Sequence, residues 1–306
     1  MNSKNIDASL FQRFMNAYSS ISGQVHYSGS IENVKDADAI VLIGAKIASD
    51  SPNLYETLKL VSKKESSKIV YAHPIEDAAM QKISTQFMKY EPGSEEGVLA
   101  LLAYHILKDV NLSEMERTFL DDLDLAYLEA ESNTGEEEFD ELIESVGKSN
   151  KRVLIVGNDL MAHHRAENIA KICAMIEKNS AFSLLIVSDS QEAIGQDSSK
   201  ECLVELEEVE DLPEYNGTVI YNLNPTETSE SSLLGSAQFA QAARISDGDY
   251  VSIVFAGQAI EREFKIDNEL KGTIAINPTF DINVEARRYK FERSEIKKIN
   301  QRVRVS

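Results

Sequence analysis

AIVLIG at residues 39–44 is a short apolar run that ends in glycine, and it opens the pattern from which the fold is predicted. Ser51 and Pro52 follow it and predict a helix start, because serine caps helices well and proline fits the first helical position. RVLIVG at residues 152–157 repeats the apolar run and its final glycine. Such runs are typical of strands in a parallel sheet, which is buried on both faces.

The segments around these two runs alternate between strand and helix patterns. After the first run we expect strands at 68–72 and 86–90 and helices at 78–83 and 94–107. After the second run we expect a helix at about 162–178 and strands at 182–187, 202–206 and 218–221. Strands that alternate with helices of this length predict right-handed crossovers. From about residue 246, glycine turns separate expected strands at 250–255, 260–266 and 273–276, which predicts a small antiparallel barrel or sandwich.

The sequence therefore predicts an α/β protein with two parallel-sheet α/β units, an acidic helical insert between them, and a small C-terminal antiparallel β cap domain. The expected boundaries are 1–110 for the first α/β unit, 111–150 for the insert, 151–235 for the second α/β unit, 236–290 for the cap and 291–306 for a basic tail. We expect the tail, from about residue 287, to be helical or frayed in part. An amphipathic N-terminal helix is expected to bury Ile6, Leu10, Phe11, Phe14 and Met15 on one face.

Composition excludes several classes of protein. The 306 residues include 31 Lys and Arg against 51 Asp and Glu, a net charge of −20, and no basic patch that would attract nucleic acid. No window is long and apolar enough to span a bilayer, and the N-terminus lacks the pattern of a secretory signal. Cys173 and Cys202 are too few for a disulfide framework or a four-cysteine metal site, so a reduced, cytoplasmic compartment is expected.

Residues 109–148 concentrate the negative charge, with 14 acidic and 2 basic residues. Ser113 and Glu116 form a capping-box pattern, and Met115, Phe119, Leu123 and Tyr127 recur at near-helical spacing, which predicts one amphipathic helix. A second helix is expected at about 139–146, with an acidic first turn at 136–138 that suits the helix dipole. We interpret this insert as a solvated helix pair that links the two α/β units.

The candidate chemical groups are few. Gly44 and Gly157 each end a predicted strand, where parallel sheets bind ligands, but neither belongs to a GxGxxG or GxxxxGK[ST] phosphate loop. His163 and His164 are adjacent and would project about 100° apart on a helix, so they do not offer two ligands to one metal, and we expect both at a helix start on the surface. His105 is expected to be packed or partly exposed on its helix. No pattern of a nucleophile elbow or zinc protease occurs, so no catalytic residue is predicted.

The order of the motifs resembles the molybdopterin oxidoreductase fold, and most closely the large peripheral-arm subunit of the proton-pumping NADH–quinone oxidoreductase, respiratory complex I. The segments concerned are DADAIVLIGA at 36–45, SP at 51–52, IVYAHP at 69–74 and YEPGSE at 90–95, followed by Leu99, Ala100 and His105. ISDGDYV at 245–251, LKGTI at 270–274 and NPTFD at 277–281 are similar to the C-terminal cap domain of that family. The resemblance covers most of the chain and is weak in the acidic insert.

The chain departs from the family pattern where polar residues would hold a pterin guanine dinucleotide. Lys46 and Ile47 stand where the family has Asn-Pro, and His73 and Ile75 stand for its Asp and Arg. Each missing polar partner would cost the ligand about 1 to 3 kcal/mol. We therefore interpret one set of positions as a degenerate pterin pocket that binds no cofactor: Gly44, Lys46, Ile47, His73, Ile75, Gly93 and Gly157.

The resemblance implies a cofactor-free structural and docking portion of that large subunit, within a complex that transfers electrons from NADH to quinone and pumps protons. Iron–sulfur clusters are expected on a missing N-terminal portion. Expected partners are the other peripheral-arm subunits, on the cytoplasmic side of the inner membrane, with no nucleic acid and no direct membrane insertion. Two alternatives stay open: a pterin-binding molybdopterin oxidoreductase fragment, and a free-standing acidic adaptor with the same fold.

Overall fold

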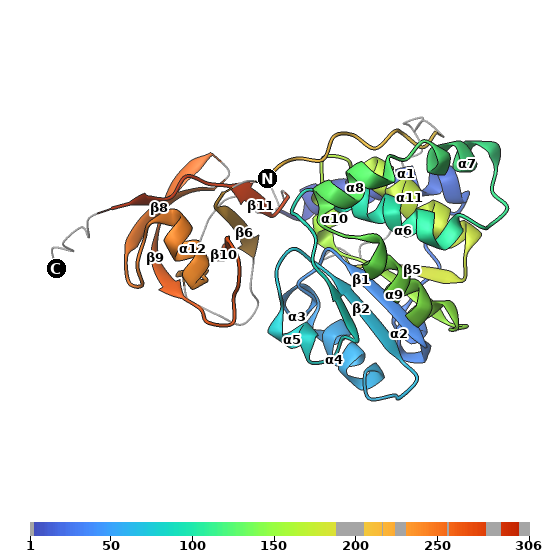
Figure 1. Cartoon of the computed structure of the whole chain (residues 1–306), viewed down its shortest axis with the longest axis horizontal. Helices are drawn as coiled ribbons and strands as arrows, with labels where there is room; N and C mark the ends of the chain where they lie inside the picture. The colour runs from blue at the N-terminus through green and yellow to red at the C-terminus, as the bar shows by residue number, and fades with distance from the viewer. Residues whose placement is uncertain are drawn as a thin grey trace. The chain divides into compact units, whose positions relative to one another are not determined.

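A computed structural model describes residues 3–187, 205–215, 217–223, 231–255, 257–279 and 289–299. The chain forms two compact units, one of Met1–Pro74 with Ala79–Glu214 and one of Ile75–Ala78 with Tyr215–Ser306 (Figure 1). The first unit is built on a parallel sheet and the second on a mixed sheet. The predicted α/β class is confirmed.

The parallel sheet of the first unit has five strands in the order β3-β2-β1-β4-β5. Its strands are β1 (Ala39–Ile43), β2 (Lys68–Ala72), β3 (Gln86–Met88), β4 (Arg152–Val156) and β5 (Phe182–Ile186). β1 pairs in parallel with β2 on one side and with β4 on the other, so that Ala39 lies between Lys68 and Arg152. The two α/β units expected from the sequence therefore share a single sheet, because the two apolar runs are neighbouring strands.

Helices cover both faces of this sheet (Figure 1). The alternation along β1 shows how: Val41 and Ile43 pack into one hydrophobic cluster, while Ile40 and Leu42 pack into the other. The first cluster lies against α1 (Ser3–Ser22), α6 (Glu95–Leu107) and α11 (Ala166–Asn179), and the second against α2 (Ile31–Asp36), α3 (Ile47–Asp50), α4 (Pro52–Val61) and α5 (Ala78–Gln81). All five residues of β1 are buried, as expected for a strand with two covered faces.

The N-terminal helix is amphipathic as predicted. Phe14 and Met15 are fully buried, and α1 packs along α11. The side chain of Ile6 lies outside the described residues. The predicted helix at about 162–178 is present as α11, which begins four residues later than expected, after the short α10 (Asn158–Ala162).

The acidic insert differs from its prediction in two ways. The expected single helix is two helices, α7 (Glu114–Asp121) and α8 (Leu125–Ser132), because Asp124 caps α8 by accepting the Tyr127 backbone N–H at 3.1 Å. Together with α9 (Glu136–Gly147), these helices bury six apolar side chains against the core of the first unit: Phe119, Leu120, Leu128, Phe139, Leu142 and Val146. The insert is therefore part of the layer that covers the sheet, and the interpretation as a solvated link was wrong.

Glu116 anchors the insert to α11. The predicted capping box is present, with the Glu116 carboxylate accepting the backbone N–H and hydroxyl of Ser113 at 3.0 and 2.7 Å. The same carboxylate accepts from Lys178 at 3.1 Å and Asn179 at 3.0 Å, and Glu116 is only 1% exposed. Burial alone would raise the pKa of Glu116, but the hydrogen bonds from Ser113, Asn179 and Lys178 lower this pKa to about 2.

The second unit holds a seven-stranded mixed sheet in the order β11-β6-β10-β7-β9-β8-β12. Its strands are β6 (Val219–Leu223), β7 (Leu233–Gly235), β8 (Tyr250–Phe255), β9 (Gln258–Ile266), β10 (Ile274–Pro278), β11 (Phe291–Arg293) and β12 (Lys297–Lys298), with one helix, α12 (Ala237–Ala243), among the described residues. β8 and β9 form the expected antiparallel hairpin, whereas β10 pairs with β6 in parallel and β7 pairs with β9 in parallel.

Two details of this unit differ from the sequence-based predictions, and one predicted strand before it cannot be compared. β6 was assigned to the second α/β unit but pairs in the mixed sheet, so the expected boundary at residue 235 falls inside that sheet. The tail residues described, 289–299, contain β11 and β12 rather than a helix, because edge positions of the sheet offer them backbone partners. Residues 202–204 of the expected strand at 202–206 lie outside the described part of the chain.

We predict that Glu116→Gln lowers the free energy of unfolding by about 2 kcal/mol at pH 7, because a charged hydrogen-bond acceptor is lost. A glutamate in the unfolded chain titrates near about pH 4.3. Since the folded pKa of Glu116 is lower, its contribution is complete above that pH and disappears as the pH falls toward 2. Urea unfolding between pH 2 and 7 should show a steeper acid loss in the unmodified protein than in the variant. Glu114→Gln, on the exposed face of the same helical turn, is the control; equal effects of the two substitutions would contradict the prediction.

Candidate functional site

The carboxyl edge of the parallel sheet is where this class of fold binds ligands, at the point where the strand order reverses. In the first unit this point lies between β1 and β4, and the segments that follow these strands begin with Gly44 and Gly157. The predicted degenerate pocket contains both glycines. The first question is therefore whether the edge between β1 and β4 is open.

Protein atoms fill the space beside both of these glycines. A Cβ added to Gly157 would lie 2.0 Å from the carbonyl oxygen of Gly44 and 2.4 Å from the Cβ of Ala45. A Cβ added to Gly44, whose φ is +69°, would lie 1.9 Å from Cδ1 of Leu160. Leu160 is itself fully buried. The two loops thus touch each other, and an α10 side chain fills the position beside Gly44.

The backbone donors at this edge are also engaged. Gly44 donates its N–H to Ala72 at 3.3 Å, and Gly157 donates to Ile43 at 2.9 Å. Asp159 donates its N–H to the Gly44 carbonyl at 3.2 Å. A phosphate-binding loop needs such N–H groups to point at the ligand. Those of Gly44, Gly157 and Asp159 are directed at protein carbonyls instead.

A buried polar cluster extends under the closed edge. His73, directly after β2, stacks on Tyr71 with ring centroids 5.8 Å apart, and its Nε2 lies 3.4 Å from Oδ2 of Asp159. Both His73 and Asp159 are fully buried. Tyr90, after β3, is also buried, and its pKa is raised well above the ordinary value by burial and then by the nearby carboxylates of Glu95 and Asp159. The side chains of this cluster are therefore buried within the protein.

His163 was predicted to lie on the surface, and this prediction was wrong. Its Nε2 donates to the carbonyl of Gly93 at 3.0 Å, and its Nδ1 accepts the backbone N–H of Arg165 at 3.1 Å. Burial, followed by the charge of neighbouring His164, lowers the pKa of His163 to about 4. The neutral ring with hydrogen on Nε2 satisfies both bonds, so the 3.6 Å approach to Glu95 is not an ion pair at neutral pH. The surface prediction holds for His164, whose side chain is 57% exposed.

The remaining predicted residues serve the packing of the fold. Lys46 begins α3 and donates its backbone N–H to Asp50, while Ile47 is fully buried in the second hydrophobic cluster. Ile75 belongs to the core of the second unit. His105 is buried and stacks on Phe139 with ring centroids 5.0 Å apart, as a packed helix residue.

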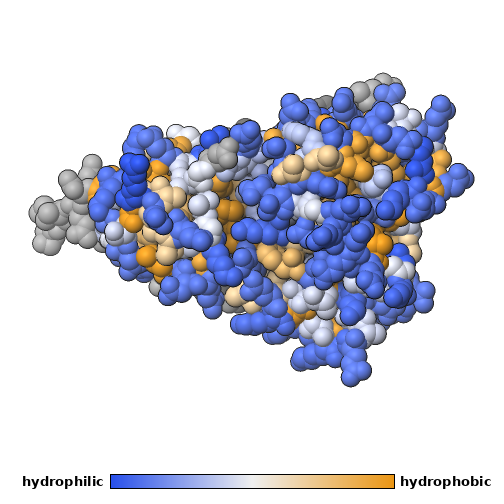
Figure 2. Space-filling model, in the orientation of Figure 1, coloured by the Kyte–Doolittle hydropathy of each residue, from blue (hydrophilic) through white to orange (hydrophobic). Residues whose placement is uncertain are grey.

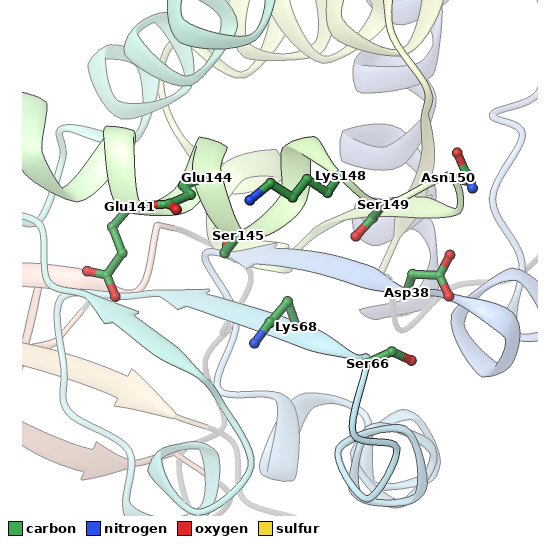
Figure 3. Close-up of a pocket in the computed structure, with 9 residues that line it drawn as sticks. All are labelled: Asp38, Ser66, Lys68, Glu141, Glu144, Ser145, Lys148, Ser149 and Asn150. Atoms are coloured by element: carbon green, nitrogen blue, oxygen red, sulfur yellow. The ribbon is translucent and has the colours of Figure 1, made fainter.

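A surface hollow lies at the opposite, amino edge of the sheet. Its volume is about 510 Å³. Figure 3 shows its lining residues, with those of α9 facing those at the starts of β1 and β2: Asp38, Ser66, Lys68, Glu141, Glu144, Ser145, Lys148, Ser149 and Asn150. Both charge signs are mixed in it. Ligands of parallel sheets bind at the carboxyl edge, so this hollow lies at the edge that this class of fold does not ordinarily use.

Sequence analysis missed a buried charge network at the start of α11. Arg165 contacts Glu96 at 3.1 Å and Glu207 at 2.8 Å, and Asn168 donates to Glu96 at 2.6 Å. Burial raises the pKa of Glu96, and the bonds from Asn168 and Arg165 oppose this rise. The signal in the sequence was the pair of acids that opens α6, Glu95 and Glu96, which need buried partners once the helix is packed.

The network holds residues 205–212, which we call the strap, against the helices of the first unit. Asn168 accepts the Glu207 N–H at 2.9 Å, Arg165 donates to the Glu208 carbonyl at 2.9 Å, and Lys171 donates to the Glu207 carboxylate at 2.9 Å. At its other end, Leu212 donates its N–H to the Tyr127 hydroxyl at 3.0 Å. The strap is therefore attached to α11 and to α8.

Three further observations concern metal, thiol and membrane sites. Among the residues described, no three His, Cys, Asp or Glu side chains are grouped so that they could hold a metal ion. Cys173 is buried, and burial raises the pKa of its thiol, while Cys202 lies outside the described residues. Within the described ranges no helix is long and apolar enough to cross a bilayer.

Comparisons with known proteins add likenesses to solved structures only. No protein-family model matches the chain, and no curated protein matches it. Among solved structures, acetylene hydratase from Pelobacter acetylenicus is similar at 10% sequence identity and a TM-score of 0.41, over 57% of this chain. The similar part spans 25% of that protein's length. A likeness this low carries no inference about function.

The residues at the sheet edge do not fit a pterin dinucleotide. Such a ligand needs a concave site with convergent polar groups. At this edge Leu160 occupies the space beside Gly44, and the loop N–H groups of Gly44 and Gly157 bond to protein carbonyls. The packing of Leu160 and the hydrogen bonds of the two glycine amides are therefore the reason that a pterin dinucleotide does not fit.

We predict that Gly157→Ala destabilises the fold by at least about 2 kcal/mol, because the new methyl group would overlap the Gly44 carbonyl and neither backbone can withdraw freely. Gly147→Ala at the end of α9 is the matched control, since a Cβ there meets nothing within 4 Å. The control should change the stability by no more than about 0.5 kcal/mol. Thermal and urea unfolding measure both; a Gly157→Ala protein as stable as the control would show that the edge is open.

We predict that Arg165→Met costs about 3 kcal/mol and loosens the strap, because Glu96 stays buried after losing its cation. Hydrogen exchange should rise at the Glu207 and Leu212 amides, and Glu96→Gln combined with Arg165→Met should recover part of the loss. The control is Arg13→Met, which breaks the exposed pair with Glu167 and should cost less than about 1 kcal/mol. Unchanged strap exchange in Arg165→Met would contradict the prediction.

Proposed function

We propose that this chain is a non-catalytic docking subunit whose ligand edge has been replaced by internal packing. The observation that carries the proposal is the closure between Gly44, Gly157 and Leu160 at the one edge where a parallel sheet binds ligands. The buried, neutral His163 and the interior position of His73 support the same conclusion, because neither imidazole can reach a substrate in solution.

The finer form of the proposal names the assembly. We infer that the chain takes part in the peripheral arm of an NADH–quinone oxidoreductase, as a portion of its large peripheral-arm subunit, on the cytoplasmic side of the inner membrane. The order of sequence motifs described above supports this assignment. In that assembly the chain would hold no cofactor and would contact other peripheral-arm subunits, while iron–sulfur clusters on other parts of the complex carry the electrons.

Two measurements test the proposal. The chain is expressed in a host that makes molybdopterin, and the purified protein is assayed for molybdenum by mass spectrometry and for pterin fluorescence after denaturation. We expect neither above the level of an unrelated protein from the same host. Tight, stoichiometric pterin would overturn the docking function in favour of an oxidoreductase fragment.

The assembly is tested separately, with a tagged chain in its native membranes. After mild solubilisation, the flavin- and cluster-containing subunits of the NADH–quinone oxidoreductase should co-purify with the tagged chain. A tagged chain without pterin that elutes free of these subunits would contradict the assignment to that complex, and would favour a free-standing adaptor.

A further inference from the structure

A surface groove of about 1120 Å³ lies between the strap and the helices α7 and α8. Its floor is apolar and is formed by Met115, Phe119, Leu123, Tyr127, Leu128, Leu206 and Val209. Phe119 and Leu128 are buried, and the others are half-buried. In Figure 2, hydrophobic surface bordered by hydrophilic surface is visible over the part of the first unit that holds α7, α8 and the strap.

The rim of the groove carries one sign of charge. Its ionisable residues are Glu114, Asp122, Asp124, Glu205, Glu208 and Asp211, all exposed, and no lysine or arginine is among the described residues that line it. Six carboxylates around an apolar floor repel an acidic partner and attract a basic one. By contrast, the hollow at the amino edge mixes lysines with acids and has no such preference.

The groove is a built feature, because both walls are fixed. The strap wall is attached to α11 through Arg165, Asn168 and Lys171. The Tyr127 hydroxyl ties the strap to α8, and Glu116 ties α7 to the end of α11. A fixed groove loses little conformational entropy when a partner binds.

Size and shape narrow the class of occupant. Drug-sized ligands bind in pockets of roughly 300–1,000 Å³ that bury most of the molecule, and this groove is larger and lies open at the surface. α7 and α8 have 8 residues each, so each wall helix is about 12 Å long. An amphipathic helix in an apolar groove, with anchors at i, i+3, i+4 and i+7, matches a long apolar floor of this kind.

We propose that this groove binds an amphipathic, basic α-helix of a partner protein, with apolar side chains on the floor and Lys or Arg side chains along the acidic rim. This inference rests on the docking function proposed above, and the groove is the surface through which the chain would dock. The exposed acids of the rim are then binding residues. The buried acids Glu96 and Glu116 keep their structural roles.

The test uses the whole purified chain and a fluorescent helical peptide of about 15 residues, with leucines on one face and lysines on its flanks. Fluorescence anisotropy should show saturable binding that weakens as salt rises. A peptide with the same leucines and glutamate flanks should not bind. A proline in the middle of the basic peptide should abolish binding, and unchanged affinity of that peptide would overturn the helical form of the occupant.

Matched variants locate the site. Asp122→Asn with Glu205→Gln and Glu208→Gln neutralises three rim acids and should weaken binding roughly tenfold. Glu136→Gln with Glu137→Gln and Asp140→Asn removes the same charge from exposed α9 positions outside the groove and should leave the affinity unchanged. Leu206→Ser should weaken binding, and Leu60→Ser, at an exposed leucine elsewhere, should not.

Three results would contradict the proposal that the groove binds a basic helix of a partner protein. Equal loss in the two triple variants would show general charge attraction and overturn the proposal. Full competition by a synthetic peptide of residues 287–306 would replace the partner by the basic tail of a second copy. If no basic peptide binds to protein that carries no pterin, the proposal that the groove binds a helix is overturned and the docking function is not. If the protein carries bound pterin, the docking function is overturned whatever the peptides do.

Discussion

The parallel pairing of β1 with β4 is the constraint on which the rest of the first unit depends. These strands are separated in sequence by β2, β3 and the whole acidic insert, yet they lie side by side at the centre of the sheet. Their pairing turns two apolar runs into one doubly covered sheet. It also brings Gly44 and Gly157 to the same edge, in a register that runs from Ala39 opposite Arg152 to Ile43 opposite Val156.

The pairing of the central strands explains why the sheet edge is closed. Once the two glycine loops are adjacent, the space between them is either open to a ligand or filled by protein. Here the short α10 turns Leu160 into it, and the loop amides bond to neighbouring carbonyls. The polar side chains His73, Asp159 and His163 are also buried. Desolvation favours neutral imidazole, and this is why burial leads the lowering of the pKa of His163.

The acidic residues divide into two groups with different physical roles. Glu96 and Glu116 are each 1% exposed and are held by donors from α11, so their charges are matched inside the fold. The six carboxylates that line the groove are exposed, and no lysine or arginine is among the described residues that line it with them. The large negative charge of the chain therefore includes structural acids at the base of the insert and a charged rim at its surface.

Local sequence patterns were enough to predict the elements that depend on local physics. Apolar runs ending in glycine predicted β1 and β4, alternation predicted the α/β class, and Ser113 with Glu116 predicted the capping box that is observed. Periodicity also identified the buried face of the N-terminal helix through Phe14 and Met15. Each of these features depends on residues within a few positions of one another, which a single sequence displays directly.

Only the tertiary structure decided which of these elements meet. The pairing of β1 with β4, the burial of His163, the transfer of β6 to the mixed sheet and the bond from Arg165 to Glu96, 69 positions away, all join distant parts of the chain. The helix break at Asp124 was missed because the apolar spacing from Phe119 through Leu123 to Tyr127 continues across it. In the structure Asp124 caps the start of α8. Strand partners, buried charges and closed edges follow from contacts between segments, and their free energy exists only when the whole sheet is assembled.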